Sequence, residues 1–317
     1  MTGASDGQLR IAVLLPCYNE EAAIAQTVAG FRAALPSAAI YVYDNNSSDR
    51  TREVAAEAGA IVRSERMQGK GNVVRRMFAD VEADIYVMAD GDATYDAAAA
   101  PALVAKLLDE QLDMVVGARK SQVEEAYRRG HRLGNRLFTG LLARLFGRTF
   151  SDIFSGYRVF SRRFAKSFPA LARGFETETE ISVHALELVM PVGEIVTTYG
   201  ARPEGSESKL STYRDGWRIL KTILHLVRIE RPVLFYGSFA LALALLAVIL
   251  SIPLMITYAE TGLVPRFPTA ILATGLMIVA ALSFMTGLIL DTVVRGRREV
   301  RRLHYLSFPG PGASDRL

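Results

Sequence analysis

The chain has 317 residues, of which 50% are hydrophobic, and its 37 Lys and Arg against 33 Asp and Glu give a formal net charge of +4. This length allows one large domain or two ordinary ones, and the hydrophobic content is high for a purely soluble protein, so contact with lipid is expected. The single cysteine excludes an intramolecular disulfide framework and a multi-cysteine zinc site, and the four histidines are too scattered to indicate a metal cluster.

The N-terminal stretch "MTGASDGQLRIAVLLPCYNEE" contains an apolar run that is too short, and wrongly flanked, for a signal peptide. We therefore expect the first domain to stay in the compartment where it is made. Residues 9–200 then alternate between two kinds of segment. The strand-like runs are "LRIAVLLP", "AIYVYD", "ADIYVMAD" and "LDMVVGAR", and the helical ones include "EEAAIAQTVAGFRAAL" and "SDRTREVAAEAG". Such alternation predicts an α/β domain with a mostly parallel sheet covered by helices.

Polar side chains gather where the predicted strands end. Ligands of such sheets bind at the carboxyl ends of the strands, so these positions predict one binding crevice. They are Pro16, Tyr18 and Glu20 after the first strand, Asp44, Asn45 and Asn46 after the second, Asp90 and Asp92 after the third, and Arg119 after the fourth.

The stretch "VMADGDATYD" places Asp90 and Asp92 one residue apart. Carboxylates at this spacing repel each other unless a positive charge lies between them. Hard oxygen ligands suit Mg²⁺ or Mn²⁺, and Mg²⁺ usually completes its shell with substrate phosphate. A surface turn with two solvated carboxylates is the alternative. The basic "GKGN" at residues 69–72 upstream favours the metal and a nucleotide diphosphate.

The C-terminal third holds two apolar stretches, at residues 233–258 and 269–290, each long enough to cross a bilayer. Basic residues precede the first and follow the second, whereas the connection holds one arginine. The positive-inside rule then places both ends of a transmembrane hairpin in the cytoplasm. The alternative is a pair of buried core helices.

Residues 216–230, "GWRILKTILHLVRIE", precede the first stretch and have a basic face opposite an apolar one. This pattern predicts a helix lying in the membrane interface, the alternative being a surface helix of the soluble domain. The basic clusters here indicate attraction to anionic lipid rather than to nucleic acid. The predicted organisation is a catalytic domain at 1–212, a juxtamembrane amphipathic helix at 213–231, the hairpin at 232–290 and a basic cytoplasmic tail at 291–317.

Seven motifs occur in the order seen in one family. They are "VLLPCYNEE", "DNNSSDRT", "GKGNVVRRMF", "ADGDATYD", "DMVVGAR", "SGYRVFSRRF" and "GFETETEI". Over residues 9–212 the chain resembles the family 2 glycosyltransferases with the GT-A fold, a Rossmann-like domain. More narrowly it is similar to the polyprenyl-phosphate glycosyltransferases, which include dolichyl-phosphate mannose synthases and undecaprenyl-phosphate sugar transferases. The hairpin matches the branch of that group with C-terminal membrane helices.

The resemblance implies roles for individual residues. Donor binding falls to Pro16, Tyr18 and Glu20 at the nucleoside and ribose, to Asp44 with Asn46 at the nucleobase, and to Lys70 and Asp90. Asp90 and Asp92 would hold the metal, Asp92 more directly. Lys70 suits a phosphate, or is a solvated helix start. Cys17 is interpreted as a packing residue, because no histidine partner for a nucleophile is readable.

The acceptor side is predicted to be basic. Arg128, Arg132 and Arg136 share a face of one expected helix, which is either a phosphate site or a solvated stripe. Arg119, Arg202 and Lys209 match loops that handle phosphate in the family. Asp152 and Glu180 match acidic positions of the family, while Glu178 falls where some relatives carry an amide. For each, orienting a neighbouring arginine is the alternative to direct catalysis.

Together these features predict a membrane-anchored, inverting hexosyltransferase that joins sugar from a nucleotide-sugar to polyprenyl phosphate, with Mg²⁺ or Mn²⁺. "DGDATY" favours UDP-glucose or UDP-N-acetylhexosamine over GDP-mannose, which remains an alternative, as do another membrane lipid as acceptor and a nucleotide-sugar sensor without turnover. The resemblance further implies the bacterial inner membrane, cell envelope glycan synthesis and a homo-oligomer. We expect no nucleic-acid partner.

Overall fold

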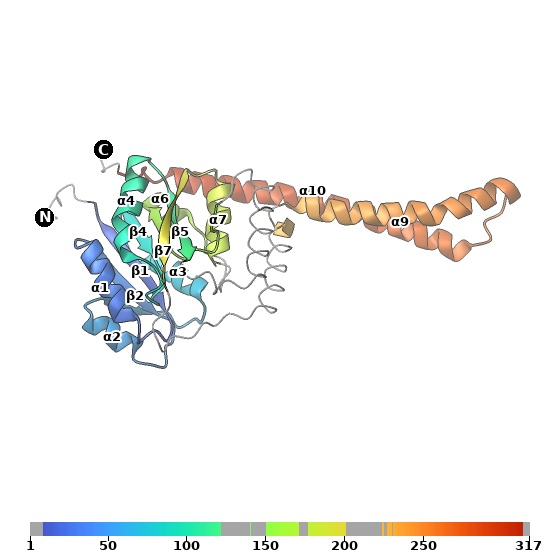
Figure 1. The fold of residues 1–317 in the computed structure, drawn as a ribbon. Coiled ribbons are helices and arrows are strands. Elements are labelled where there is room, and N and C mark those ends of the chain that lie inside the picture. The colour runs from blue at the N-terminus through green and yellow to red at the C-terminus, as the bar shows by residue number, and fades with distance from the viewer. Residues whose placement is uncertain are drawn as a thin grey trace. The chain divides into compact units, whose positions relative to one another are not determined.

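The computed structural model describes residues 9–121, 140, 150–170, 177–200, 224, 227–229 and 231–312. The chain divides into two compact units, one formed by Met1–Gly216 with Arg301–Leu317 and the other by Trp217–Val300. The elements of the first unit (Figure 1) are β1 Ile11–Cys17, α1 Ile24–Ala34, β2 Ala39–Asp44, α2 Thr51–Glu57, β3 Ile61–Ser64, α3 Lys70–Asp80, β4 Ile85–Met88, η1 Ala97–Ala99, α4 Ala100–Asp109, β5 Met114–Ser121, β6 Arg158–Ser161, α6 Arg162–Ser167, α7 Thr177–Glu187 and β7 Val192–Tyr199.

The strands form a seven-stranded sheet in the order β3-β2-β1-β4-β6-β5-β7. β1 pairs in parallel with β2 and β4, β2 with β3, and β5 with β7. β6 runs antiparallel to both of its neighbours, β4 and β5. The predicted α/β fold with a mostly parallel sheet is confirmed. The sequence did not predict β3, β6 or β7, which are short or carry exposed residues.

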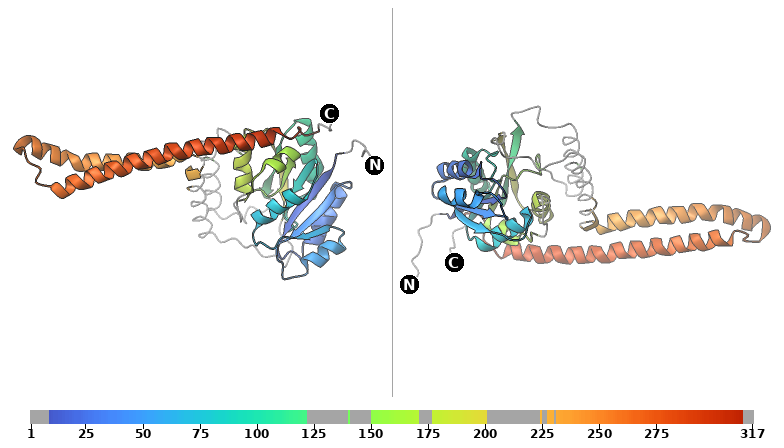
Figure 2. Two further views of the ribbon diagram at one scale, coloured as in Figure 1. Left: turned by 180° about the vertical axis from the view of Figure 1, so that it is seen from behind. Right: turned by 90° about the horizontal axis from the view of Figure 1, so that it is seen from below.

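Helices cover both faces of this sheet, as the views from behind and below show (Figure 2). α1 packs with α2 and α4, whereas α3 packs with α6 and α7. Alternate residues of a strand face opposite sides, so β1 sends Val13 and Leu15 into the core under α1 and Leu14 into the other layer. That second layer is aromatic, since Phe78 meets Phe160 edge to face at 5.5 Å between ring centroids. The central strands of the sheet are therefore buried on both sides, and polar side chains gather at the ends of the strands.

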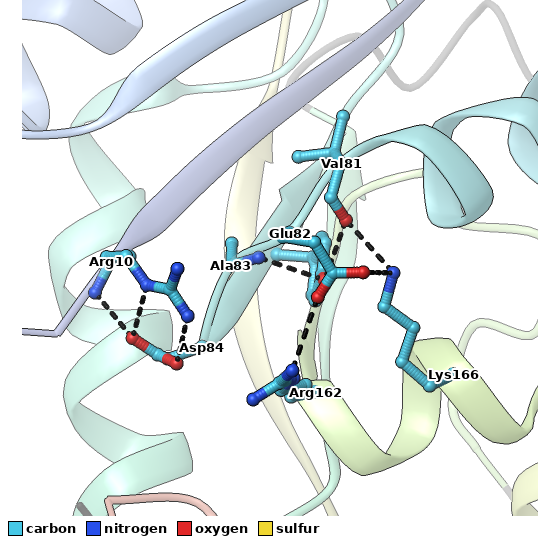
Figure 3. A network of polar contacts seen from close by, with 8 residues as sticks. Arg10, Val81, Glu82, Ala83, Asp84, Arg162 and Lys166 are labelled. Atoms are coloured by element: carbon cyan, nitrogen blue, oxygen red, sulfur yellow. Dashed lines mark hydrogen bonds and ion pairs between the residues drawn. The ribbon is translucent and has the colours of Figure 1, made fainter. Parts of the chain in front are cut away.

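Ion pairs close the edge of the sheet where β1 and β4 begin (Figure 3). The backbone N–H of Arg10 donates to Asp84 at 2.8 Å, and the guanidinium of Arg10 contacts the same carboxylate. Lys166 and Arg162 pair with Glu82 at 2.6 and 3.3 Å. Such partly exposed pairs contribute little to stability individually. They do satisfy the charges at this edge.

The first unit also contains the end of the last helix, α10 Phe267–Leu306. Arg301 pairs with Glu187 at the end of α7 at 2.7 Å, and the Tyr305 hydroxyl donates to Asp113 at 2.7 Å. Asp113 is fully buried and also accepts from Ser161 and Arg163. We predicted a tail beyond residue 290. The structure instead continues the helix to Leu306 and packs its last turns on the α/β domain, because buried carboxylates of that domain need donors.

The second unit holds α9 Pro232–Thr261 and most of α10. Within the described residues these two helices are long and apolar enough to span a membrane, with mean hydropathies of 2.8 and 2.1. Only 11% and 17% of the apolar windows are buried, which argues against the alternative of core helices in a soluble protein. The buried positions on α10, which are small or β-branched, recur every seven residues at Ala273, Ala280, Gly287 and Val294.

Gly287 shows why these positions are small. A Cβ there would lie 3.2 Å from the Cβ of Tyr236 and 3.4 Å from the carbonyl oxygen of Pro232 on α9. Close backbone approach at small residues is typical of helix pairs in lipid, where packing replaces the hydrophobic effect as the driving force. The two helices thus form a pair whose large apolar side chains point outward, such as Leu241, which is 60% exposed.

Candidate active site

The carboxyl ends of β1, β2, β4 and β5 meet at one edge of the sheet. Cys17 at the end of β1 is in register with Asp44 at the end of β2, and Leu14 of β1 is in register with Met88 at the end of β4. Because β6 is antiparallel, Arg158 at its start lies opposite Met88, and residues 152–157 reach the same edge. The predicted gathering of polar side chains therefore follows from the register of the strands.

The turn after β2 is held by its own side chains. Asp44 is 2% exposed and accepts two bonds from the backbone N–H of Ser47, at 3.2 and 3.3 Å. Asn46 has a left-handed backbone with φ of 64°, which Asn tolerates better than most residues, and donates to the carbonyl of Arg66 at 2.8 Å. The structure thus places Asp44 and Asn46 together at the predicted donor end of the crevice.

The residues predicted around β1 divide into two groups. Pro16 lies inside the strand opposite Tyr43, rather than after it. Tyr18 and Glu20 follow the strand, and the Tyr18 side chain is exposed. The backbone N–H of Glu20 donates to the Thr51 hydroxyl at 2.8 Å, which ties this loop to the start of α2. Tyr18 therefore offers a ring face, and Glu20 a carboxyl group, next to the Asp44 turn.

The turn after β4 carries the two aspartates. Asp92 is buried, and its Oδ1 accepts from the hydroxyl and the backbone N–H of Thr94, at 2.6 and 3.2 Å. Ala93 between them has φ of 57°, a strained conformation for a residue with a Cβ. At Gly91 a Cβ would collide with Cys17, so the turn requires glycine there. The hydrogen bonds to Thr94 and the close packing of Gly91 on Cys17 restrict the backbone of this turn, and therefore the directions of both carboxylates.

A buried cation lies beside Asp90. Lys70 Nζ is 2.5 Å from Asp90 Oδ1 and 2.5 Å from Glu178 Oε1. Burial alone would lower the pKa of Lys70, but the two carboxylates outweigh it and raise the pKa above its usual value. Lys70 is therefore a buried positive charge held by Asp90 and Glu178, and it is not a solvated helix start.

Arg119 and Asp152 form a second charged pair at this edge. The guanidinium of Arg119 donates to both carboxylate oxygens, at 2.6 and 2.9 Å, and also stacks over Tyr199 at 5.4 Å. Burial would raise the pKa of Asp152, but the bonds from Arg119 lower it. Arg119 lies within β5, in register with Thr197, and not after the strand as predicted. Asp152 is thus held as an ionised partner that orients Arg119, which was one of the two interpretations left open.

Two residues that the sequence analysis named without a definite role acquire one in the structure. The Asn45 amide donates to the carbonyls of Glu65 and Met67 and accepts from the N–H of Gly69, so it fixes the loop that leads into Lys70. Glu178 is buried on α7, at a spacing of three, four and seven residues from the buried Ile181, Ser182 and Ala185. The sequence named Glu178 as an acidic candidate without a settled role, and its position on the buried face of a helix indicates a charged partner.

Three further residues complete the surroundings of the site. Arg158 is fully buried and donates to the carbonyls of Ser155 and Ile153 and to the Ser182 hydroxyl; burial lowers its pKa to about 10. Tyr95 accepts from the backbone N–H of Gly156 at 2.8 Å. Glu180 lies in the first turn of α7. The predicted acceptor residues Arg128, Arg132, Arg136, Arg202 and Lys209 lie outside the described residues.

A divalent cation fits the residues present. Asp90 and Asp92 supply hard oxygen donors, and an octahedral ion usually takes one or two carboxylates and completes its shell with substrate phosphate and water. Among the described residues, no group of three or more His, Cys, Asp or Glu could hold a metal without help. Cys17 is buried, and burial raises its pKa well above the usual value, which agrees with a packing role.

An α/β domain with carboxylates at this edge is the arrangement of nucleotide-sugar transferases, and comparison with known proteins agrees. Residues 12–168 match the model of glycosyl transferase family 2. The chain is 31% identical over 234 residues to the glycosyltransferase AglJ of Haloferax volcanii, covering 73% of this chain and 77% of that protein. The chain belongs to glycosyl transferase family 2.

Other similar proteins include RfbJ of Shigella flexneri, 57% identical over 38% of this chain and 95% of that protein. A dolichyl-phosphate hexose transferase of Haloferax volcanii is 29% identical over 70% of this chain and 95% of its own length. Glucosyl-3-phosphoglycerate synthase from Mycobacterium tuberculosis, solved with Mn²⁺, UDP and its product, superimposes with a TM-score of 0.56 at 24% identity over 69% of this chain and 79% of that one. This last likeness confirms the GT-A fold.

Proposed function

We propose that the protein transfers a hexose from a nucleotide-sugar, with UDP-glucose or a UDP-N-acetylhexosamine favoured, to a polyprenyl phosphate in the membrane. The observation that carries the proposal is the occurrence, on one chain, of the family 2 carboxylate edge and two outward-facing apolar helices. The similarity to a dolichyl-phosphate hexose transferase supports the lipid phosphate as acceptor. The Mn²⁺ and UDP bound in the related fold support a UDP donor that would bind together with a divalent cation.

In this proposal the chain's own residues have separate tasks. Asp44, Asn46, Tyr18 and Glu20 bind the nucleoside, and Pro16 shapes the strand end beneath it. Asp90 and Asp92 hold the cation, which when bound neutralises the diphosphate as it leaves. The lipid phosphate is already anionic at neutral pH, so it needs little help from a base. Its oxygen forms a bond to the anomeric carbon while the bond from that carbon to the diphosphate breaks, with inversion.

The acceptor side brings two anions together. Arg119, held by Asp152, is a candidate for aligning the incoming phosphate, because a planar guanidinium matches phosphate in two-point contact. Arg128, Arg132, Arg136, Arg202 and Lys209 are proposed to complete that site from the sequence. Glu180 remains a candidate for orienting one of these cations. The catalytic advantage would come mainly from alignment and electrostatic stabilisation.

The test uses the full chain in detergent with undecaprenyl phosphate, Mg²⁺ or Mn²⁺, and a panel of UDP-glucose, UDP-N-acetylglucosamine and GDP-mannose. We expect release of nucleoside diphosphate that depends on the lipid phosphate, with a glycolipid product. Release that the lipid phosphate does not change would favour another acceptor, and nucleotide binding without release would favour a sensor. A preference for GDP-mannose would correct the donor.

Metal dependence is checked in the same assay. Chelation is expected to abolish turnover, and Asp92→Asn to lower kcat on the order of a hundredfold or more, since an electrostatic stabiliser of the leaving group is lost. Asp96→Asn is the matched control, because Asp96 lies four residues on, caps η1 through the N–H of Ala98, and an amide can still accept that bond. Full activity in chelator would contradict the metal assignment.

A further inference from the structure

Lys70 joins three segments that are far apart in the chain. It occupies the first turn of α3, Asp90 follows β4, and Glu178 lies in the first turn of α7. The side chains of Lys70 and Glu178 are 13% and 7% exposed, whereas that of Asp90 is 31% exposed. One ammonium is therefore shared by a deeply buried carboxylate and by a more accessible one.

The surroundings hold this arrangement in place. A Cβ at Gly156 would lie 2.8 Å from Asp90 Oδ2 and 3.2 Å from Lys70 Nζ, so the backbone of Gly156 packs directly on the ion pair. The Tyr95 hydroxyl fixes Gly156 from the other side by accepting its N–H. The Asn45 amide fixes the loop before Lys70. The Lys70 ammonium thus has little freedom to move away from either carboxylate.

Sharing has an electrostatic consequence. Lys70 and two carboxylates carry one net negative charge, whereas Lys70 paired with Asp90 alone is neutral. A cation that approaches Asp90 is attracted by the first arrangement and not by the second. Glu178 does not need to contact the divalent cation for this effect, because its negative charge offsets the charge of Lys70 that would otherwise neutralise Asp90.

We propose that Glu178 is a positioning residue for the metal site: by holding Lys70, it keeps the carboxylate of Asp90 available to a divalent cation. The inference rests on the proposed function in that Asp90 and Asp92 are taken as the metal ligands. Partners one shell away from a metal change its affinity by about ten- to a hundredfold when they are removed. We expect a change of that size for Glu178, although it is separated from the metal by a lysine.

The experiment measures Mn²⁺ binding to the full chain in detergent by electron paramagnetic resonance, with saturating UDP and without lipid acceptor. Glu178→Gln keeps the size of the side chain and removes the charge, and it is expected to weaken Mn²⁺ binding about ten- to a hundredfold. The double variant Lys70→Met with Glu178→Gln removes the competing cation as well, and is expected to recover most of the affinity. If Glu178 had only a structural role, the double variant would bind Mn²⁺ more weakly than Glu178→Gln, because the second substitution would disturb the packing further.

Folding is followed in the same samples through the rate at which the buried Cys17 thiol reacts with a maleimide. Equal Mn²⁺ affinity in wild type and Glu178→Gln overturns the inference and leaves the proposed function standing. Further loss in the double variant, with Cys17 still protected, also overturns it. Absence of UDP-dependent Mn²⁺ binding in the wild type overturns the proposed metal site and this inference with it. Recovery of Mn²⁺ affinity in the double variant supports the inference about Glu178.

Discussion

Arg301 is expected to stabilise the α/β domain although it is 114 residues away in the chain from its partner Glu187. Its guanidinium is 2.7 Å from Glu187, whose side chain is 2% exposed, while that of Arg301 is 18% exposed. Replacing Arg301 with Ala leaves the Glu187 carboxylate buried without this partner. Breaking a fully buried pair in this way costs about 3–5 kcal/mol.

The cost here should be smaller than that limit, because water reaches part of Arg301. We expect a loss of roughly 2–3 kcal/mol in the free energy of unfolding. For a domain of this size, each kcal/mol lowers the Tm by about 2–4 °C, so the Tm should fall by about 4–12 °C. Glu187→Gln in the Arg301→Ala background removes the buried charge that has lost Arg301 and should recover much of the loss.

The assay is the temperature dependence of Cys17 labelling in the full chain, since this thiol is buried at the end of β1 and reports on opening of the sheet itself. Arg302→Ala is the matched control, because Arg302 is the next residue along the helix and is exposed. A Tm for Arg301→Ala within 1 °C or so of the control would refute the reasoning. So would a double variant that is no more stable than the single one.

Three other predictions concern pH, packing and substrate handling. Burial, together with the charge of Arg301, lowers the pKa of His184 to about 3. The contribution of His184 to stability is therefore fully present above its unfolded pKa near 6.5 and is lost as the pH drops from 6.5 toward 3. At pH 5 the loss in the free energy of unfolding should be roughly 2 kcal/mol. His184→Leu should reduce the pH dependence of the free energy of unfolding, measured by urea denaturation between about pH 7.5 and 5. An unchanged pH dependence would contradict this. Gly287→Leu should separate α9 from α10 and weaken a disulfide or cross-link engineered between them, whereas exposed Leu288→Ala should not. Asp44→Ala should weaken nucleotide binding measured without lipid, while Arg132→Ala should raise the lipid phosphate requirement about ten- to a hundredfold; the reverse pattern in paired titrations would invert the proposed crevice.

The sequence predicted the edge of the sheet that carries the site because strand order matters little for this inference. Any mostly parallel arrangement brings the carboxyl ends of successive strands to one side, so Asp44 and Asp90 had to meet. The apolar helices were equally readable, since lipid imposes length and composition directly. The roles of Asp44 and Asp90 in donor and metal binding, in contrast, stay predictions.

What could not be predicted were partners that depend on long-range packing. The contact of Lys70 with Glu178 joins residues on two helices whose faces are set only by the folded sheet. "SGYRVFSRRF" holds three arginines that look equivalent in the sequence, yet Arg158 is fully buried because β6 runs antiparallel into the core. The return of residues 301–306 to the domain was hidden for the same reason, since Asp113 reveals its need for donors only once it is buried.

The charges at the edge also support the proposed metal site. Arg119 and Asp152 neutralise each other, and Lys70 offsets only one of the two carboxylates that hold it. Asp92 and Asp44 are two further buried carboxyl groups at this edge, and the fully buried Arg158 is one further basic group there. A diphosphate would be repelled from this edge, because its own charge is negative and the local dielectric is low. We propose that a divalent cation on Asp90 and Asp92 would offset two of these negative charges next to the leaving diphosphate, so donor affinity should rise with metal concentration and fall steeply in its absence.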